Sequence, residues 1–185
     1  MFNIIIAGVG GQGTVLASKI ICAAAVKSGK YVVSSETIGM AQRGGSVVSH
    51  IRINEEEVVC SPLIDAGGAD MIIAFEPAEG VRALPFLKKG GRMVVATGII
   101  PPITKYDYDK QKLFNFLAEN VTELKLVDGA AVCEACGSSR VLNMVLVGAA
   151  EKFLPFGGIE ETIKESVKPK FVEMNLKAIE GGRKL

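Results

Sequence analysis

Four glycines near the N-terminus have the type and spacing of a phosphate-binding loop. The segment GVGGQG places Gly8, Gly10 and Gly13 in the pattern G-x-G-x-x-G, with Gly11 and Gln12 between them. In such a loop the first glycine permits a tight turn, the second lets a pyrophosphate approach the backbone, and the third lets a helix pack against a strand. The helix that follows favours an anion at its N-terminus.

The rest of the dinucleotide-binding fingerprint is incomplete. An acidic residue that binds the ribose is expected at the end of the second strand, and Glu36 lies 23 residues after Gly13, beyond two serines. The loop alone is therefore compatible with three roles. It can be a dinucleotide site, an anion site for another phosphate or carboxylate, or a turn whose glycines serve only packing.

A second glycine cluster stands about thirty residues further along the chain. Arg43 directly precedes Gly44 and Gly45. An arginine can bind a carboxylate or phosphate through two parallel hydrogen bonds, and paired glycines allow the backbone to come close to a ligand. On local chemistry alone, a surface turn with a solvated arginine is the simpler interpretation.

The surrounding elements predict an α/β fold. Residues 2–7 are an isoleucine-rich run typical of a buried parallel strand, and the good helix formers of residues 14–27 precede a strand at 31–33. A strand at 46–53 is expected to form a hairpin with residues 56–64 through a turn at Asn54-Glu55. Further strands are expected at 69–75, 92–97 and 123–127, with helices from Pro77 to Gly90-Gly91 and at 109–119.

These elements predict one domain over residues 1–185. It should be a Rossmann-like, doubly wound and mostly parallel sheet with a β-hairpin insertion. Its last third, about residues 129–185, should be helical, with breaks at 137–139, 155–158 and Pro169.

Composition excludes several classes of protein. The chain has 21 basic and 20 acidic residues and a net charge of +1, so neither a nucleic-acid nor a membrane partner is expected. No apolar run reaches the ~20 residues that span a bilayer, and we expect a cytoplasmic protein with reduced cysteines. Cys133 and Cys136 form a C-x-x-C pair, for which a redox role, half of a zinc site and two small helical residues all stay open.

Several motifs, taken in order, resemble one family. They are GVGGQG, RGG, SVVSHIRI, SPLID, ADMIIAFEPAEGVR, SSRVLNMVLVGA and FVEMNLKAIEGG. Together they are similar to the gamma-type subunit of the 2-oxoacid:ferredoxin oxidoreductases, and most of all to its indolepyruvate type. Such enzymes decarboxylate a 2-oxoacid on thiamine diphosphate, pass electrons through iron–sulfur clusters to ferredoxin and release an acyl-CoA.

The resemblance implies that this chain is a small subunit, inactive alone and without catalytic or metal-binding residues of its own. A large (alpha) subunit would carry thiamine diphosphate, Mg²⁺ and the [4Fe-4S] clusters. The sequence agrees, because it lacks both a run of four closely spaced cysteines and a G-D-G…N stretch.

Within the resemblance, the glycine loop (Gly8, Gly10, Gly11, Gln12 and Gly13) is an anion-binding or interface loop. Arg43, Gly44 and Gly45 would lie at a subunit interface or at the entrance for substrate or CoA. Two alternatives remain. They are a stand-alone NAD(P)- or flavin-binding oxidoreductase and a non-enzymatic nucleotide-binding scaffold.

Overall fold

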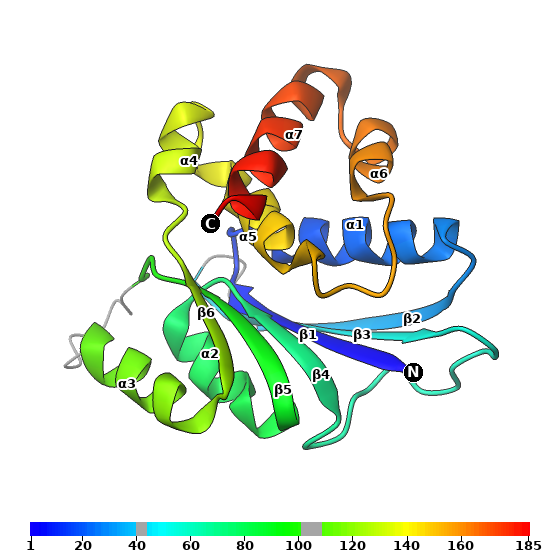
Figure 1. Ribbon diagram of the computed structural model, residues 1–185, viewed down its shortest axis with the longest axis vertical. Helices are drawn as coiled ribbons and strands as arrows, with labels where there is room; N and C mark the ends of the chain where they lie inside the picture. The colour runs from blue at the N-terminus through cyan, green and yellow to red at the C-terminus, as the bar shows by residue number, and fades with distance from the viewer. Residues whose placement is uncertain (40–43, 101–108) are drawn as a thin grey trace.

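A mixed sheet forms the centre of the molecule (Figure 1). The computed structural model describes residues 1–39, 44–100 and 109–185. Strands β1, β4, β5 and β6 are parallel, whereas β3 is antiparallel to both of its neighbours, β1 and β2. The strand order is β2 (Tyr31–Ile38), β3 (Ser46–Asn54), β1 (Phe2–Val9), β4 (Ala69–Ala74), β5 (Leu87–Ala96) and β6 (Glu123–Val127).

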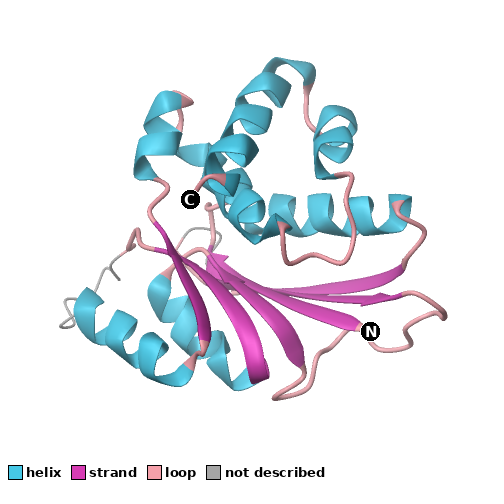
Figure 2. Cartoon of the chain, in the orientation of Figure 1, coloured by secondary structure: helices cyan, strands magenta, loops and turns pink. Residues whose placement is uncertain are grey.

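Helices cover both faces of this sheet (Figure 2). One face carries α1 (Thr14–Lys27), α4 (Ala130–Ala135), α5 (Leu142–Glu151), α6 (Ile159–Ser166) and α7 (Pro169–Arg183). The other face carries α2 (Pro77–Ala83) and α3 (Lys110–Asn120). Two short 3-10 turns, Leu84–Phe86 and Ser139–Val141, lead into β5 and α5. The predicted α/β fold and its helical last third are therefore confirmed.

Strand β1 explains why the sheet has a core on each side. Successive side chains of a strand point to opposite faces. Ile4 and Ile6 pack in the core beneath α1 and α5, while Ile5 packs in the core that includes Ile72 and Leu117 on the α2–α3 side. The run of isoleucines is thus what a strand covered on both faces requires.

The expected hairpin between residues 46–53 and 56–64 is wrong. Strand β3 pairs along its whole length with β1 on one edge and with β2 on the other. Neither edge of β3 is left for residues 56–64, which form no strand. Pro62 in that segment also lacks the N–H that a sheet interior needs. The hairpin of this fold is β2–β3, and β2 extends to Ile38 rather than ending at Val33.

The helix after Pro77 also ends earlier than predicted. It stops at Ala83, followed by the 3-10 turn that contains Pro85, and β5 then begins at Leu87 and includes Gly90 and Gly91. A proline lacks the N–H donor and crowds the preceding turn, so it does not continue an α-helix. The glycines therefore lie inside a strand and do not terminate a helix.

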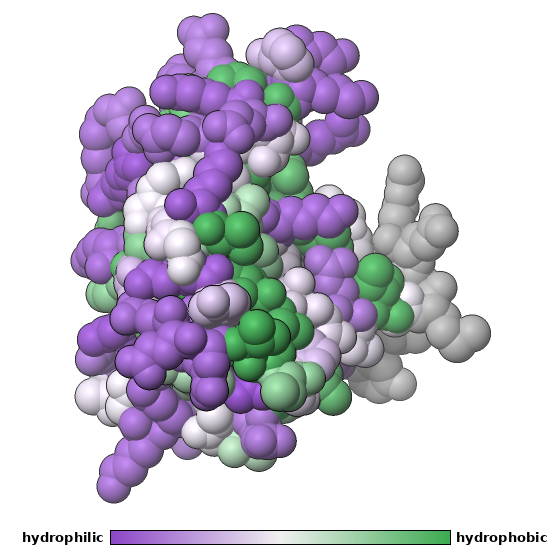
Figure 3. Space-filling view, turned by 90° about the vertical axis from the view of Figure 1, so that its right-hand side faces the viewer, coloured by the Kyte–Doolittle hydropathy of each residue, from purple (hydrophilic) through white to green (hydrophobic). Residues whose placement is uncertain are grey.

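Strand β6 forms one edge of the sheet, and β2 forms the other. Figure 3 views this side of the molecule and shows apolar side chains gathered in the middle of a mostly polar face. The exposed apolar residues of α1 and β2 are Val26, Tyr31 and Ile38.

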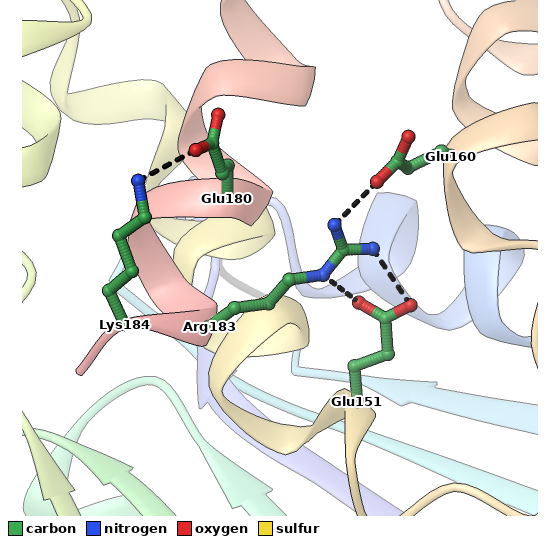
Figure 4. Close-up of polar contacts among 5 residues, drawn as sticks. All are labelled: Glu151, Glu160, Glu180, Arg183 and Lys184. Carbon is green, nitrogen blue, oxygen red and sulfur yellow. Dashed lines mark hydrogen bonds and ion pairs between the residues drawn. The ribbon is translucent and has the colours of Figure 1, made fainter.

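The C-terminal helices are fastened to one another by backbone contact and by an arginine. A Cβ added to Gly182 of α7 would lie 2.0 Å from the carbonyl oxygen of Val145 in α5, so the two helices touch at their backbones. Arg183 donates Nε–H to Glu151 of α5 at 2.8 Å and also pairs with Glu160 of α6 (Figure 4). This contact fixes α5, whose N-terminal end reaches the glycine loop.

Candidate functional site

The glycine loop joins β1 to α1 at the carboxyl edge of the parallel strands. Gln12 holds it closed, because its Oε1 accepts from the N–H of Val9 at 2.7 Å and its Nε2 donates to the carbonyl of Phe75 at 2.9 Å. Gly13 has a φ of 81° and starts α1 without any side-chain cap. The first N–H groups of α1 are therefore left to bind a ligand or water.

Two of the glycines are required by packing. A Cβ on Gly8 would lie 2.7 Å from Cγ2 of Thr14 and 2.9 Å from Cβ of Phe75. A Cβ on Gly13 would lie 2.7 Å from Nδ2 of Asn143, a side chain of α5 that is only 3% exposed. Asn143 Nδ2 donates to the carbonyl of Gly13 at 3.4 Å, so α5 supports the loop directly.

The structure brings the second glycine cluster against the first. Gly10 donates its N–H to the carbonyl of Gly45 at 2.8 Å, and Gly44 donates to the carbonyl of Gly10 at 3.4 Å. The antiparallel direction of β3 causes this contact, since its first residue, Ser46, pairs with Val9. Arg43 lies outside the described residues.

A buried carboxylate beside this contact was missed by sequence reasoning. Glu79 of α2 is 5% exposed, accepts from the hydroxyl of Ser46 at 2.6 Å and pairs with Arg82 at 2.5 Å. Glu76 caps α2 by accepting from the N–H of Ala78 at 2.7 Å. The segment FEPAEGVR carried a signal, because an acid before a proline and another in the first turn are typical of a helix start.

A pocket of about 770 Å³ opens beside the glycine loop. It is lined by Gly10, Gly11, Gln12, Gly98, Ile99, Ile100, Ser139, Arg140 and Leu142. Ser138 accepts from the N–H of Arg140 at 3.3 Å and so orders the turn that carries this arginine. The Arg140 side chain is exposed, and no hydrogen bond or ion pair joins its guanidinium to the described residues. This pocket combines the Arg140 cation, the glycine loop that precedes α1 and an apolar wall, which suits an anionic ligand with an apolar part.

Glu36, the acid considered for ribose binding, lies elsewhere. It lines a different hollow, between α1 and β2. In a dinucleotide-binding fold the second strand is the neighbour of the first, whereas here β3 separates β1 from β2. One inserted strand adds about 4.8 Å to that distance. The acid and the glycine loop are therefore not arranged as a dinucleotide site requires.

The histidine and the C-x-x-C pair are placed away from the pocket lining. His50 is buried, its Nδ1 accepts from the N–H of Ile64 at 3.1 Å, and its ring meets the ring of Phe86 edge-on. Burial lowers the pKa of the His50 imidazole. Cys133 and Cys136 are free thiols of α4 and its C-terminal cap, and burial raises the pKa of Cys133. Among residues 1–39, 44–100 and 109–185, no group of three or more potential ligands is positioned to hold a metal ion.

With this geometry in hand, comparison with known proteins identifies the family. Residues 3–185 match the pyruvate ferredoxin/flavodoxin oxidoreductase family, and the chain belongs to it. It is 42% identical to the indolepyruvate oxidoreductase subunit IorB of Archaeoglobus fulgidus, over 97% of this chain and 92% of that one. It is 30% identical to the 2-oxoglutarate synthase subunit KorC of Methanothermobacter thermautotrophicus, over 97% and 92% of the two chains.

The fold agrees with that assignment. The gamma subunit of a keto/oxoacid ferredoxin oxidoreductase from Geobacter sulfurreducens superposes with a TM-score of 0.73 at 24% identity, covering 100% of this chain and 97% of that one. The chain is accordingly a subunit of a 2-oxoacid:ferredoxin oxidoreductase, and it acts as part of a complex of several subunits. In the part of the chain that the structure describes, none of the helices has the length and apolarity to cross a bilayer.

Proposed function

We propose that this chain is the small subunit of an oxidoreductase that acts on aryl 2-oxoacids such as indolepyruvate. The support is the difference in similarity, since the chain is 42% identical to an indolepyruvate oxidoreductase subunit and 30% identical to a 2-oxoglutarate synthase subunit. The reaction converts the 2-oxoacid and CoA into acyl-CoA and carbon dioxide, and the released electrons reduce ferredoxin.

In this proposal the large (alpha) subunit carries thiamine diphosphate, Mg²⁺ and the [4Fe-4S] clusters. When bound there, those groups supply the decarboxylation chemistry and the route for electrons. The present chain contributes binding and orientation at the edge of its sheet, and we expect it to be inactive alone.

The pocket beside the glycine loop is proposed to receive a phosphate of CoA, and a substrate carboxylate is the other candidate. The observation that carries this assignment is Arg140, a cation in the pocket wall without a partner among the described residues. The pocket-lining residues Gly10–Gln12 directly precede α1, whose N-terminus has no side-chain cap, and both an arginine and an uncapped helix N-terminus favour a phosphate. Arg43, the residue before Gly44 in the sequence, is proposed to bind a CoA phosphate or a substrate carboxylate.

The substrate is tested on the assembled complex. The chain is tagged, purified anaerobically with its large subunit, and assayed for CoA-dependent reduction of ferredoxin with indolepyruvate, 2-oxoglutarate and pyruvate. A kcat/KM highest for indolepyruvate supports the assignment. A preference for 2-oxoglutarate or pyruvate rejects the aryl specificity and leaves the family unchanged.

The pocket is tested by Arg140→Ala and Arg140→Lys in that complex. We expect the KM for CoA to rise roughly tenfold or more in Arg140→Ala and less in Arg140→Lys, because a charge-assisted hydrogen bond is worth about 1.5–3 kcal/mol. The matched control is Arg92→Ala, since Arg92 lies in the middle of β5, pairs with Glu123 at the start of β6 and does not line the pocket. If Arg140→Ala and Arg43→Ala both leave assembly and the KM values for CoA and substrate unchanged, the anion-binding role is wrong.

The alternative of a stand-alone dinucleotide enzyme is tested by titrating the purified chain with NADH. The position of β3 between β1 and β2 argues against it. Saturable binding of NADH by the isolated chain would favour this alternative.

A further inference from the structure

Strand β2 has an open edge, and Glu36 is the one charged residue in its sequence. It pairs with β3 in an unbroken register from Tyr31 opposite Asn54 to Ile38 opposite Val47, and no described strand lies on its other side. Proteins usually block such an edge with proline, lysine, a bulge or a covering loop. The eight residues of β2 contain no proline, no lysine and no bulge.

The surface next to this edge is hollowed and partly apolar. Helix α1 and β2 enclose a groove of about 720 Å³, lined by Ser18, Lys19, Cys22, Ala23, Val26, Lys27, Val32, Ser34 and Glu36. Val26 in its lining and Ile38 at the end of the strand are each 57% exposed.

We propose that this edge pairs with the same edge of a second copy of the chain. The two β2 strands run antiparallel across a two-fold axis perpendicular to the sheet, which joins the two sheets into one and keeps both α1 helices on the same face. Residues directly opposite each other in an antiparallel pair point to the same face, so the axis passes at a residue and not between two residues. Pairing over the greatest length of the strand places the axis at Ser34 or at Ser35. These two serines are the middle residues of the strand.

Charge complementarity favours a second copy as the occupant. The groove has Glu36 toward the C-terminal end of β2 and Lys27 at the C-terminal end of α1, where β2 begins. Antiparallel pairing places the end of one β2 beside the start of the other. Each Glu36 therefore approaches Lys27 of the second copy, whose ammonium also pairs with Glu165 of its own chain, and the two-fold axis makes this contact twice. The chain is thus complementary to itself in charge as well as in backbone.

The test is sedimentation velocity of the full chain at low salt, with charge-reversal variants. We expect wild type to form a dimer that Glu36→Lys and Lys27→Glu each weaken by roughly tenfold or more, because like charges then face each other twice. An equimolar mixture of the two variants should recover the dimer, since both contacts then join opposite charges. That recovery also shows that both variants are folded.

Two controls separate this interface from general effects of charge. The first control, Glu119→Lys, reverses a charge on the exposed surface of α3. The second, Glu165→Gln, removes only the ion pair that Lys27 makes within its own chain. Both should leave the dimer intact. Three results would overturn the proposal. These are a monomeric wild type, a dimer equally strong in both reversal variants, and hydrogen exchange of residues 31–38 that is slowed only when the large subunit is added.

Discussion

The contact between Gly13 and Asn143 gives the sharpest test of how the glycine loop is supported. In Gly13→Ala, the new Cβ stands 2.7 Å from Nδ2 and 3.3 Å from Cγ of Asn143. The backbone φ of 81° adds a second cost, about 1–2 kcal/mol for any residue with a side chain. Overpacking of a buried site costs typically about 1–3 kcal/mol. The expected loss in the free energy of unfolding is therefore about 2–5 kcal/mol.

Two further variants separate these costs. Gly11 has a φ of 102°, but a Cβ there meets nothing within 4 Å, so Gly11→Ala carries only the backbone cost. Asn143→Ala removes the side chain with which the new Cβ at position 13 would collide. In the combination of Gly13→Ala with Asn143→Ala, the overpacking should disappear, and the double variant should lose less than the two single losses added together.

The assay is urea unfolding followed by circular dichroism, with the chain alone and at fixed pH. The reasoning is refuted if Gly13→Ala and Gly11→Ala lose the same stability, or if the losses of Gly13→Ala and Asn143→Ala simply add. A thermal scan provides an independent reading, since each kcal/mol lowers the Tm of a chain of this size by about 2–4 °C.

Three other predictions concern stability. Burial lowers the pKa of the His50 imidazole in the folded chain below its ordinary value of 6.5, so the unfolded chain binds the proton more readily and stability is lost as pH falls below 6.5. The urea midpoints measured at about pH 7.5 and about pH 5.5 should therefore differ less in His50→Gln than in the wild type. Arg183→Gln breaks the half-exposed pairs with Glu151 and Glu160 and should lower the free energy of unfolding by about 1 kcal/mol, and by less at high salt. Thermal scans measure this, and equal losses at low and high salt would contradict it. Asp109→Ala removes the cap that accepts from the first turn of α3 and should cost about 1 kcal/mol in urea unfolding, whereas Asp109→Asn should cost less.

Local patterns were sufficient for most elements of the fold. The apolar run at residues 2–7 and the helix formers at 14–27 predicted β1 and α1, because burial on two faces and helical periodicity are properties of neighbouring residues. The pairing of residues 46–53 was not accessible in the same way. Its alternation predicted a strand, but which strands flank it depends on residues far away in the chain, and the nearest candidate at 56–64 was wrong.

For the candidate site, too, local features were predictable from the sequence and long-range contacts were not. The glycine pattern predicted a tight loop between a strand and a helix, with the third glycine allowing these two to pack closely, whereas the neighbour of Gly13 is a side chain of another helix, α5. It could not show that the supporting side chain is Asn143, 130 residues later, or that Arg140 lines the same pocket. Those two residues were visible only as polar positions in an apolar segment. Glu79 was hidden for another reason, because a carboxylate that is buried and paired looks in sequence like one on a solvated helix.

The central place of β1 also constrains how the chain reaches its native state. This strand is synthesised before its partners β3 and β4, which end only at Asn54 and Ala74, and α5, which packs on β4 and β5 of the same sheet, follows later still. At about 5–20 residues per second, the ribosome needs several seconds to supply those partners. During that time an isoleucine-rich strand stays without its sheet. Folding should therefore be slow and dominated by long-range pairing, and nascent chains that stop before α5 should depend on chaperones.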